Sequence, residues 1–192
     1  MRILLLLLFP LFTCAQEISF RDLKDGKLKS DSSYVYALPF EKGKSFFLIQ
    51  GYNSKMSHRG EVALDFKMRK GTKVCCMREG IVKELKEDSN RGGLRTKYFS
   101  EGNYILVQHS DHSYAWYFHL KRNGALVNVG DSISRGQVIG LSGNTGYSLF
   151  PHLHVEVVVH DENRYKQIPM RFQLRGGVRY LKPFHFYRNI LE

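Results

Sequence analysis

The chain has 192 residues and carries 29 Lys and Arg against 18 Asp and Glu, so its formal net charge is +11 at pH 7. That length fits one domain with a substantial core, and three cysteines are too few for a disulfide-stabilised scaffold. The positive charge suits an acidic polymer or serves only solubility, and the lack of a basic helical stripe or a nucleic-acid-binding motif argues against nucleic acid as a partner.

The first residues have the pattern of a secretory signal peptide, which we predict to span residues 1–15. Arg2 precedes a short apolar run, and Ala15 is the small residue before the expected cleavage site. We therefore expect an exported protein of the periplasm, the cell envelope or the extracellular space. The run is shorter than the roughly 20 residues that cross a bilayer, so no transmembrane span is expected. Lipidation of Cys14 is the alternative, although the preceding Leu-Phe-Thr is a poor match for it.

Residues 16–45 are polar and weakly patterned and are predicted to form an N-terminal arm, followed by one domain over residues 46–192. Apolar and β-branched runs between glycine turns predict strands at residues 45–50, 61–68, 74–77, 80–85, 103–109, 113–119, 137–141 and from 152 onward, with a last strand at 178–186. Residues 86–101 are charged and rich in Gly and Ser, which predicts a long exposed loop. Cys75 and Cys76 are expected to pack in a strand rather than to bond each other. These patterns indicate an all-β protein, a compact antiparallel two-sheet sandwich or barrel-like hybrid with little helix.

Two histidines, His152 and His154, stand at the start of a β-branched run. Residues two apart on a strand share a face, and Leu153 between them then points the opposite way, into a core. The glycine-rich residues 140–146 predict a sharp loop ahead of the pair. Two parallel imidazoles beside such a loop could form half of a metal site, since His is the commonest metal ligand. The alternative is a pair of polar side chains on the solvent face of a strand.

Asp65 lies inside an otherwise apolar strand, where a carboxylate is costly to bury unless it is paired or bound to a metal. A solvent-facing position on an edge strand is the alternative. His58 and His119 lie at strand ends, beside glycine or aromatic residues. Two imidazoles, one carboxylate and a water would complete a tetrahedral zinc site with an open catalytic position. Further imidazoles nearby could transfer protons or stabilise charge.

Several segments in the right order resemble the lysostaphin and LytM-type zinc endopeptidases, which cut peptide cross-links in bacterial cell walls. They cover roughly half of the chain and are His-Arg-Gly-Glu-Val-Ala-Leu-Asp-Phe at 58–66, Gly-Thr-Lys-Val at 71–74, Gly-Ile-Val at 80–82, Tyr-Phe-His-Leu at 117–120, the glycine-rich segment 130–146 and His-Leu-His at 152–154.

The resemblance implies zinc ligation by His58, Asp65 and His154. It implies that His119 and His152 are catalytic imidazoles that do not bind the metal, and that the β fold carries an active-site groove. The implied activity is that of a zinc metalloendopeptidase acting on the peptide stems of peptidoglycan, and a monomer is expected. A net positive charge suggests a positive groove, which would suit an acidic stem.

One departure from the family's commonest motif concerns the first two proposed ligands. Six residues separate His58 from Asp65, where three are usual, and seven extended steps would span about 23 Å. The chain must therefore fold back, and Gly60 is the expected turn residue. Glu61 is the alternative ligand. An inhibitory loop, in which Asn53 occupies the open metal position, is a further hypothesis.

The remaining histidines match no catalytic position and are expected at the surface or around the site; they are His109, His112, His160 and His185. Two alternatives to an enzyme stay open at this point. One is a non-catalytic zinc-binding module of the same fold that regulates or scaffolds other cell-wall enzymes. The other is a β domain that binds carbohydrates or polyanions and has incidental histidines.

Overall fold

The structure is a computed structural model that describes Arg21, Leu23, Asp25, residues 34–161 and residues 164–190. The predicted signal peptide 1–15 and Cys14 lie outside the described residues. Within those described ranges, no helix is long and apolar enough to cross a membrane.

The regular structure of the described residues is mostly strand, with one short 3-10 helix and two helical residues, Arg21 and Leu23, near the N-terminus. The elements are β1 (Val35–Tyr36), β2 (Ser45–Gln50), β3 (Ala63–Lys67), β4 (Lys73–Cys75), β5 (Gly80–Lys86), β6 (Gly92–Gly93), η1 (Thr96–Glu101), β7 (Tyr104–Gln108), β8 (Tyr114–Phe118), β9 (Leu120–Ala125), β10 (Ser132–Ile133), β11 (Val138–Ser142), β12 (Gly146–Tyr147), β13 (His152–Asp161), β14 (Arg164–Ile168), β15 (Arg171–Leu174), β16 (Gly177–Arg179) and β17 (His185–Arg188).

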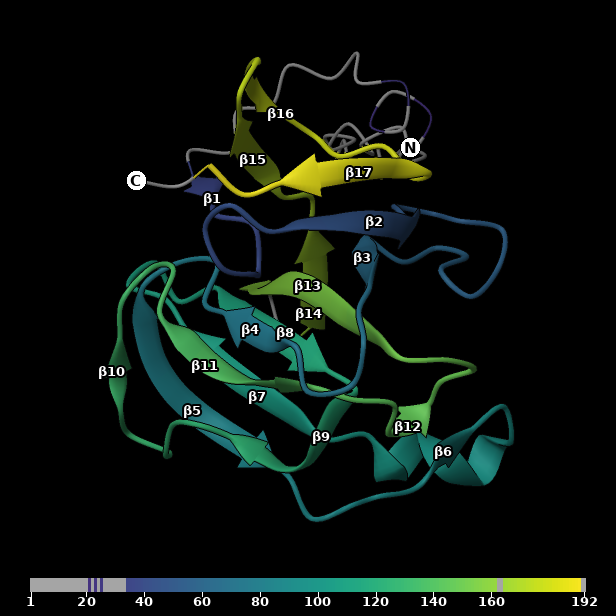
Figure 1. Ribbon diagram of the computed structural model, residues 1–192. Coiled ribbons are helices and arrows are strands. Elements are labelled where there is room, and N and C mark those ends of the chain that lie inside the picture. Colours follow the sequence, from purple (N-terminus) through teal and green to yellow (C-terminus); the bar gives the residue numbers. More distant parts are fainter. Residues whose placement is uncertain (1–20, 22, 24, 26–33, 162–163, 191–192) are drawn as a thin grey trace, which may run out of the picture.

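The largest sheet has the strand order β10-β5-β7-β8-β13-β3-β2-β17, and β14 pairs with the far end of β13. A smaller sheet, β4-β11-β9, lies over part of it (Figure 1). The two sheets meet closely, because a Cβ added to Gly140 of β11 would lie 3.2 Å from Cδ1 of Ile105 of β7. The expected all-β, mainly antiparallel architecture is confirmed, and two further small sheets, β1-β15-β16 and β12-β6, accompany these two.

Alternation along the central strands decides which side chains enter the core. Leu153, Val155 and Val157 of β13 are fully buried, which leaves His152 and His154 on the opposite face. In β3, Leu64 and Phe66 are buried in the same core cluster. The shared face of the two histidines, predicted from their spacing, is therefore confirmed.

Part of the predicted N-terminal arm packs against the domain. Tyr36, Leu38 and Phe40 are buried in the core cluster, and β1 pairs in parallel with β15. The proposed boundary at residue 46 stays a prediction. Cys75 and Cys76 are buried and free, as expected for packing residues.

Two segments differ from the sequence-based expectations. The single strand predicted at 178–186 is wrong: β16 ends at Arg179 and β17 begins at His185. Pro183 lacks an N–H and Phe184 has a left-handed φ of 66°, so the strand cannot run through. The loop predicted at 86–101 also carries β6 and η1. Such short elements lack the periodicity that makes a strand or helix recognisable.

Candidate metal centre and catalytic groove

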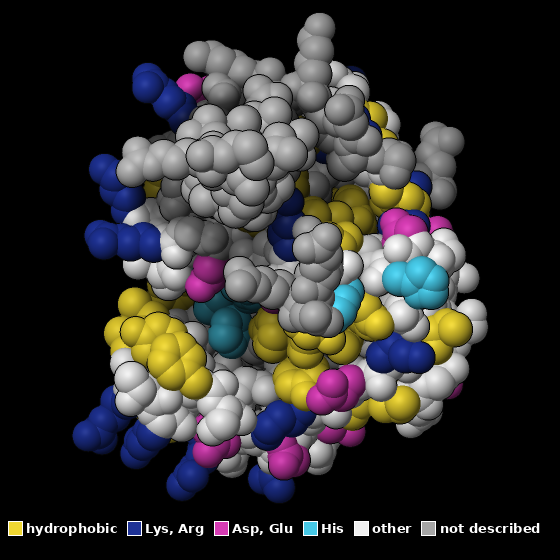
Figure 2. All heavy atoms as spheres, turned by 180° about the vertical axis from the view of Figure 1, so that it is seen from behind, with side chains coloured by type: hydrophobic (Ala, Val, Ile, Leu, Met, Phe, Trp, Pro, Cys, Tyr) yellow, Lys and Arg dark blue, Asp and Glu magenta, His cyan; other side chains and the backbone are white. Residues whose placement is uncertain are grey.

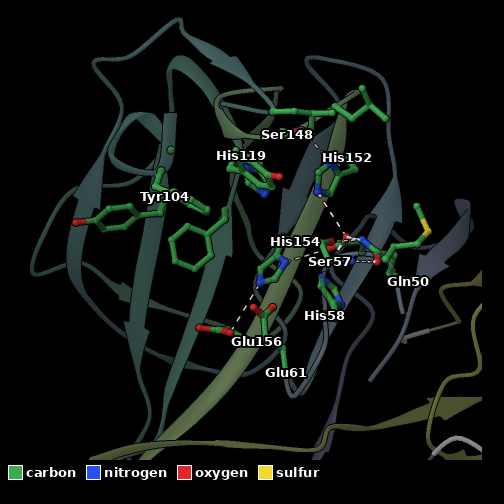
Figure 3. A pocket seen from close by; sticks show the side chains of 18 of the residues that line it. Gln50, Ser57, His58, Glu61, Tyr104, His119, Ser148, His152, His154 and Glu156 are labelled. Carbon is green, nitrogen blue, oxygen red and sulfur yellow. Dashed lines mark hydrogen bonds and ion pairs between the residues drawn. The ribbon is translucent and has the colours of Figure 1, made fainter. Parts of the chain in front are cut away.

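A groove of about 900 Å³ opens on the outward face of β13. His152, His154 and Glu156 of β13 line it, together with the loop before β3, the 3-10 helix η1 and the loop before β13. Figure 2 shows histidine side chains lying in a hollow beside hydrophobic side chains. In Figure 3 the imidazoles of His58, His119, His152 and His154 point toward one another.

Asp65 is at the centre of this cluster. It is only 3% exposed and lies on β3 between β13 and β2, so the alternative of a solvent-facing position on an edge strand is wrong. Its Oδ1 is 3.0 Å from Nδ1 of His154, and its Oδ2 is 3.2 Å from Nε2 of His58. Among the described residues, its ion-pair partners are three imidazoles and no Lys or Arg.

The donor set fits a zinc ion. The Asp65 carboxylate oxygens lie 3.0 Å from Nδ1 of His154 and 3.2 Å from Nε2 of His58, and two ligands about 2 Å from one ion are at most about 4 Å apart. Two imidazoles and a carboxylate also match the chemistry of catalytic zinc sites that keep a fourth position open. Glu61 lines the groove but stands outside this group of three.

The buried Asp65 carboxylate is charged and is stabilised by a positively charged partner. Burial alone would raise the pKa of Asp65, but hydrogen bonds from His154 and His58 outweigh it and hold that pKa well below its usual range. Burial likewise opposes charge on His154, yet hydrogen bonds to Asp65 and Glu156 raise the pKa of His154 to about 10. A proton on His154 thus supplies the positive charge that a metal ion would supply in its place.

The turn between His58 and Asp65 resolves their long spacing. Gly60 has a left-handed φ of 77°, and the amide of Glu61 donates to the carbonyl of His58, so the chain folds back as expected. The Asn53 side chain takes part in the same turn, since its Oδ1 accepts a hydrogen bond from the Gly60 amide at 3.0 Å. In this structure Asn53 therefore stabilises the loop instead of reaching the ligand cluster.

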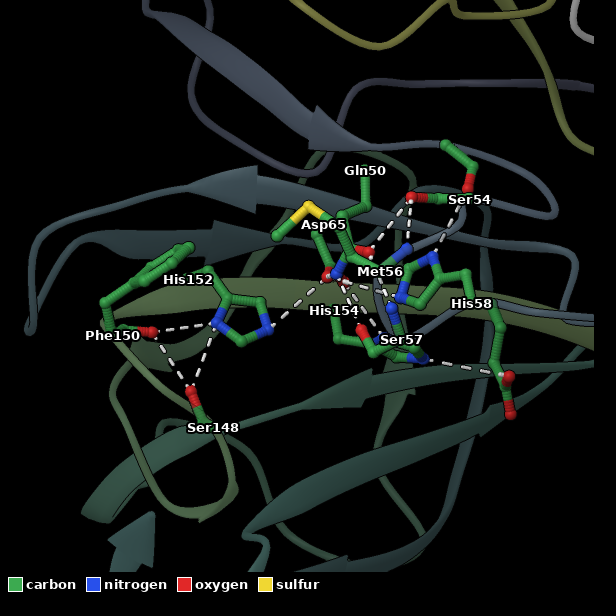
Figure 4. A network of polar contacts seen from close by, with 12 residues as sticks. Gln50, Ser54, Met56, Ser57, His58, Asp65, Ser148, Phe150, His152 and His154 are labelled. Carbon is green, nitrogen blue, oxygen red and sulfur yellow. Dashed lines mark hydrogen bonds and ion pairs between the residues drawn. The ribbon is translucent and has the colours of Figure 1, made fainter. Parts of the chain in front are cut away.

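Gln50 contacts the candidate metal site and was missed by sequence reasoning. Its Nε2 donates to Oδ2 of Asp65 at 2.7 Å, and its Oε1 accepts hydrogen bonds from the Ser57 amide and the Ser54 hydroxyl (Figure 4). A register shift between Leu48 and Gln50 sets Gln50 opposite Asp65. The one signal in the sequence was a polar residue ending the apolar run Phe46 to Ile49.

The imidazoles of His119 and His152 are held alike. Nδ1 of His119 lies 2.7 Å from the carbonyl of Thr145, and Nδ1 of His152 lies 2.8 Å from the carbonyl of Phe150. A carbonyl only accepts, so each Nδ1 carries the hydrogen and each Nε2 keeps a free lone pair. The two ring centroids are 4.5 Å apart, and Nε2 of His152 is 3.7 Å from Oδ2 of Asp65.

Both of these imidazoles are neutral at pH 7. Burial, followed by repulsion from His152 and His154, lowers the pKa of His119 to about 3. Burial is also the largest effect on His152 and lowers its pKa, although the nearby Asp65 carboxylate opposes the shift. Neutral rings with a free Nε2 in a groove are equipped to accept a proton.

The other histidines lie away from the groove lining. His112, His160 and His185 are exposed. His109 is buried, so its expected place at the surface or around the site is wrong; its Nδ1 contacts the carbonyl of Glu79. The positive groove suggested by composition is wrong as well, since the charged residues that line it are Glu61, Asp65 and Glu156 against Lys86.

Residues 58–166 match Peptidase family M23, and this segment is more than half of the chain. The chain belongs to peptidase family M23. Membership confirms the resemblance inferred from the motifs, and the cluster of His58, Asp65 and His154 agrees with a metal site rather than with incidental histidines.

Curated relatives are similar over this domain. Peptidoglycan DD-endopeptidase ShyA of Vibrio cholerae is 39% identical over 95 residues, which are 50% of this chain and 19% of that protein. Lysostaphin of Staphylococcus simulans is 39% identical over 116 residues, 59% of this chain and 21% of that protein. The chain thus spans about a fifth of the length of these relatives.

Solved structures share the architecture. A zinc-containing peptidase from Vibrio cholerae superposes with a TM-score of 0.51 at 29% identity, covering 70% of this chain and 39% of that one. Lysostaphin from Staphylococcus simulans gives a TM-score of 0.50 at 32% identity, covering 64% of this chain and 47% of that one.

Proposed function

We propose that this chain hydrolyses peptide cross-links in bacterial peptidoglycan, with His58, Asp65 and His154 as zinc ligands. The observation that carries the proposal is the Asp65 carboxylate, buried among three imidazoles in a groove that also receives the Nε2 atoms of two neutral histidines. Relatives named as peptidoglycan DD-endopeptidase and as lysostaphin support a cell-wall substrate.

In such a site a bound zinc ion supplies Lewis acidity, which polarises a peptide carbonyl and lowers the pKa of a water. His152 acts as the general base, because its Nε2 is free and the Phe150 carbonyl holds its Nδ1–H. The imidazolium formed at His152 is stabilised by Asp65, 3.7 Å away. His152 then returns the proton to the leaving amine.

His119 stabilises the oxyanion that develops on the scissile carbonyl. Its Nδ1–H is held by the Thr145 carbonyl, so its Nε2 can face the substrate only as an acceptor until it takes up a proton. Negative charge growing beside the ring raises the pKa of His119, so that Nε2 takes up a proton from solvent water and donates a hydrogen bond to the oxyanion.

The proposed place of action is the periplasm, the cell envelope or the extracellular space. Export rests on the signal-peptide pattern of residues 1–15, and the similarity to cell-wall enzymes agrees with it. A lipid anchor at Cys14 is the alternative mode of retention, and the monomeric state is part of the same proposal.

Release of soluble fragments from purified peptidoglycan tests the activity. We expect zinc-loaded protein to release cross-link-derived fragments, chelator to stop the release and added zinc to restore it. Mass analysis of the products identifies the bond that is cut. Zinc-loaded, folded protein that releases nothing would support the non-catalytic module instead.

A further inference from the structure

A row of side chains crosses the sheet from the proposed base to the edge strand. His152 of β13 pairs with Lys67 of β3, Lys67 pairs with Phe47 of β2, and Phe47 pairs with Phe186 of β17. Directly paired residues on neighbouring strands project from the same face. The four side chains therefore form one line on the face that carries the groove.

Side-chain contacts connect the two ends of this row, and strand pairing joins Lys67 to Phe47 between them. The Phe47 and Phe186 ring centroids lie 5.1 Å apart. Nζ of Lys67 lies 5.5 Å from the ring centroid of Phe150, and that ring is 5.8 Å from the ring of His152. The row thus joins an aromatic pair at the sheet edge to the catalytic groove.

The fold does not explain why Phe186 is exposed. Its side chain is 72% exposed, while the next residue, Tyr187, packs against the core from the other face of β17. An exposed aromatic ring that packs on a half-buried one beside a binding groove is typical of a ligand-contacting surface.

The chemistry of the row fits a sugar chain that carries peptides. Aromatic faces bear partial negative charge and attract the partly positive C–H groups of a sugar ring, and Lys67 can pair with a free carboxylate of the peptide. From β13 to β17 there are three strand spacings, about 14 Å. Four extended residues cover about the same distance, so a short peptide could reach from a sugar at Phe186 to the proposed base.

We propose that Phe47, Lys67 and Phe186 form a second subsite that binds the amino-sugar chain of the substrate while its peptide occupies the groove. This inference rests on the proposed peptidoglycan activity. A lipid surface is the weaker candidate, because the row shares its face with the groove and a membrane pressed against it would cover the entrance.

Two soluble substrates separate the subsite from the catalytic site. One is a cross-linked fragment that keeps its disaccharides, and the other is the same cross-linked peptide freed from sugar by an amidase. For Phe186→Ala we expect KM for the sugar-bearing fragment to rise about tenfold with kcat unchanged, as for the loss of one aromatic contact. Turnover of the sugar-free peptide should stay at the wild-type level. Phe186→Tyr should restore KM, and Lys67→Gln should raise it.

Tyr165→Ala is the matched control, since Tyr165 is an aromatic residue with 70% exposure on β14, at the far end of β13. Equal KM values for wild type and Phe186→Ala on the sugar-bearing fragment would overturn the inference while leaving the proposed activity intact. A loss of binding to acidic phospholipid vesicles, with both KM values unchanged, would overturn it in favour of a membrane contact. Wild-type protein that cleaves neither substrate would instead refute the proposed function.

Discussion

Asp65 lies directly opposite His154 across the β3–β13 pair, and its Oδ1 is 3.0 Å from Nδ1 of His154. Strand pairing alone therefore brings a carboxylate and an imidazole to one point, although they are 89 residues apart in the chain. The third member, His58, is added by the turn at Gly60. The candidate metal site is thus held mainly by the sheet and completed by one loop.

Measuring the zinc content of alanine variants should distinguish the proposed metal ligands from the proposed catalytic imidazoles. Because His154 is one of three proposed ligands, we expect His154→Ala to lose zinc. His119→Ala and His152→Ala should keep about one zinc per chain and lose activity by roughly 10² to 10⁴-fold, the usual cost of removing a general base or an oxyanion donor. Elemental analysis and peptidoglycan release measure the two properties.

His185→Ala is the control for this series, because His185 is exposed and lies outside the groove lining. Its zinc content and activity should match the wild type. Loss of zinc from His152→Ala with retention in His154→Ala would reverse the two roles.

Gln50→Ala should weaken zinc binding without removing a ligand. Gln50 holds Oδ2 of Asp65 at 2.7 Å and links it to the Ser54–Ser57 segment, so its loss frees the carboxylate to rotate. Groups that orient a metal ligand typically contribute a factor of about 10 to 100 in affinity. Competition with a fluorescent zinc chelator measures the change. Ser54→Ala is the control, because it removes only one contact to Oε1 of Gln50 and should change the zinc affinity much less. Equal zinc affinities for both variants and the wild type would contradict the role of Gln50.

Zinc binding should release about one proton at pH 7. The pKa of His154 in the metal-free protein is raised from 6.5 to about 10, so the ring is protonated across the neutral range and must lose that proton to bind zinc. Affinity should therefore rise about tenfold per pH unit below pH 10. Conversely, the His154–Asp65 pair stabilises the metal-free fold fully between pH 3.8 and pH 6.5. This contribution is lost as pH rises through about 10, the raised pKa of His154, and as pH falls through the lowered pKa of Asp65. Calorimetry in buffers of different ionisation enthalpy counts the protons; a count of zero would contradict this account.

Gly146→Ala should disturb the support of His119. Gly146 has a φ of 80°, and a Cβ there would lie 2.7 Å from Cα of Gly102 and 3.4 Å from Nδ1 of His119. A left-handed Ala by itself costs about 1–2 kcal/mol, and the close approach of its Cβ adds to that cost. We therefore expect the unfolding free energy to fall by about 3 kcal/mol or more, together with reduced activity. Gly71→Ala is the matched control, since Gly71 has a φ of 83° and open space around it. Equal losses in the two variants, measured by chemical denaturation, would show that the close approach has no role.

Local patterns were enough to predict the central strands and the shared face of His152 and His154. The two-residue period places His152 and His154 together and Leu153 in the core, and this depends only on neighbours in the chain. The fold-back at Gly60 followed from chain reach, because an extended segment would hold His58 too far from Asp65.

What could not be predicted depends on pairing between distant segments. The contact of Gln50 with Asp65 requires a register shift in β2, which no pattern within β2 reveals. The pairing of β6 with β12 joins Gly92 to Gly146 and holds a segment that looked like a loop. Leu94, Phe99 and Ser100 of this segment form a wall of the groove. The acidic lining of the groove likewise cannot be predicted from the net charge, because composition does not say on which face of the molecule the charged side chains lie.

The floor of the groove and its wall differ in how many strands hold them. Asp65 and His154 lie on strands with a hydrogen-bonded neighbour on each side, whereas residues 92–93 are joined to β12 by only two paired residues. Local opening of the wall therefore costs less free energy than opening the floor, and its amides should exchange with solvent first. Such opening would widen the groove for the branched polymer proposed as substrate, while the three proposed ligands keep their places.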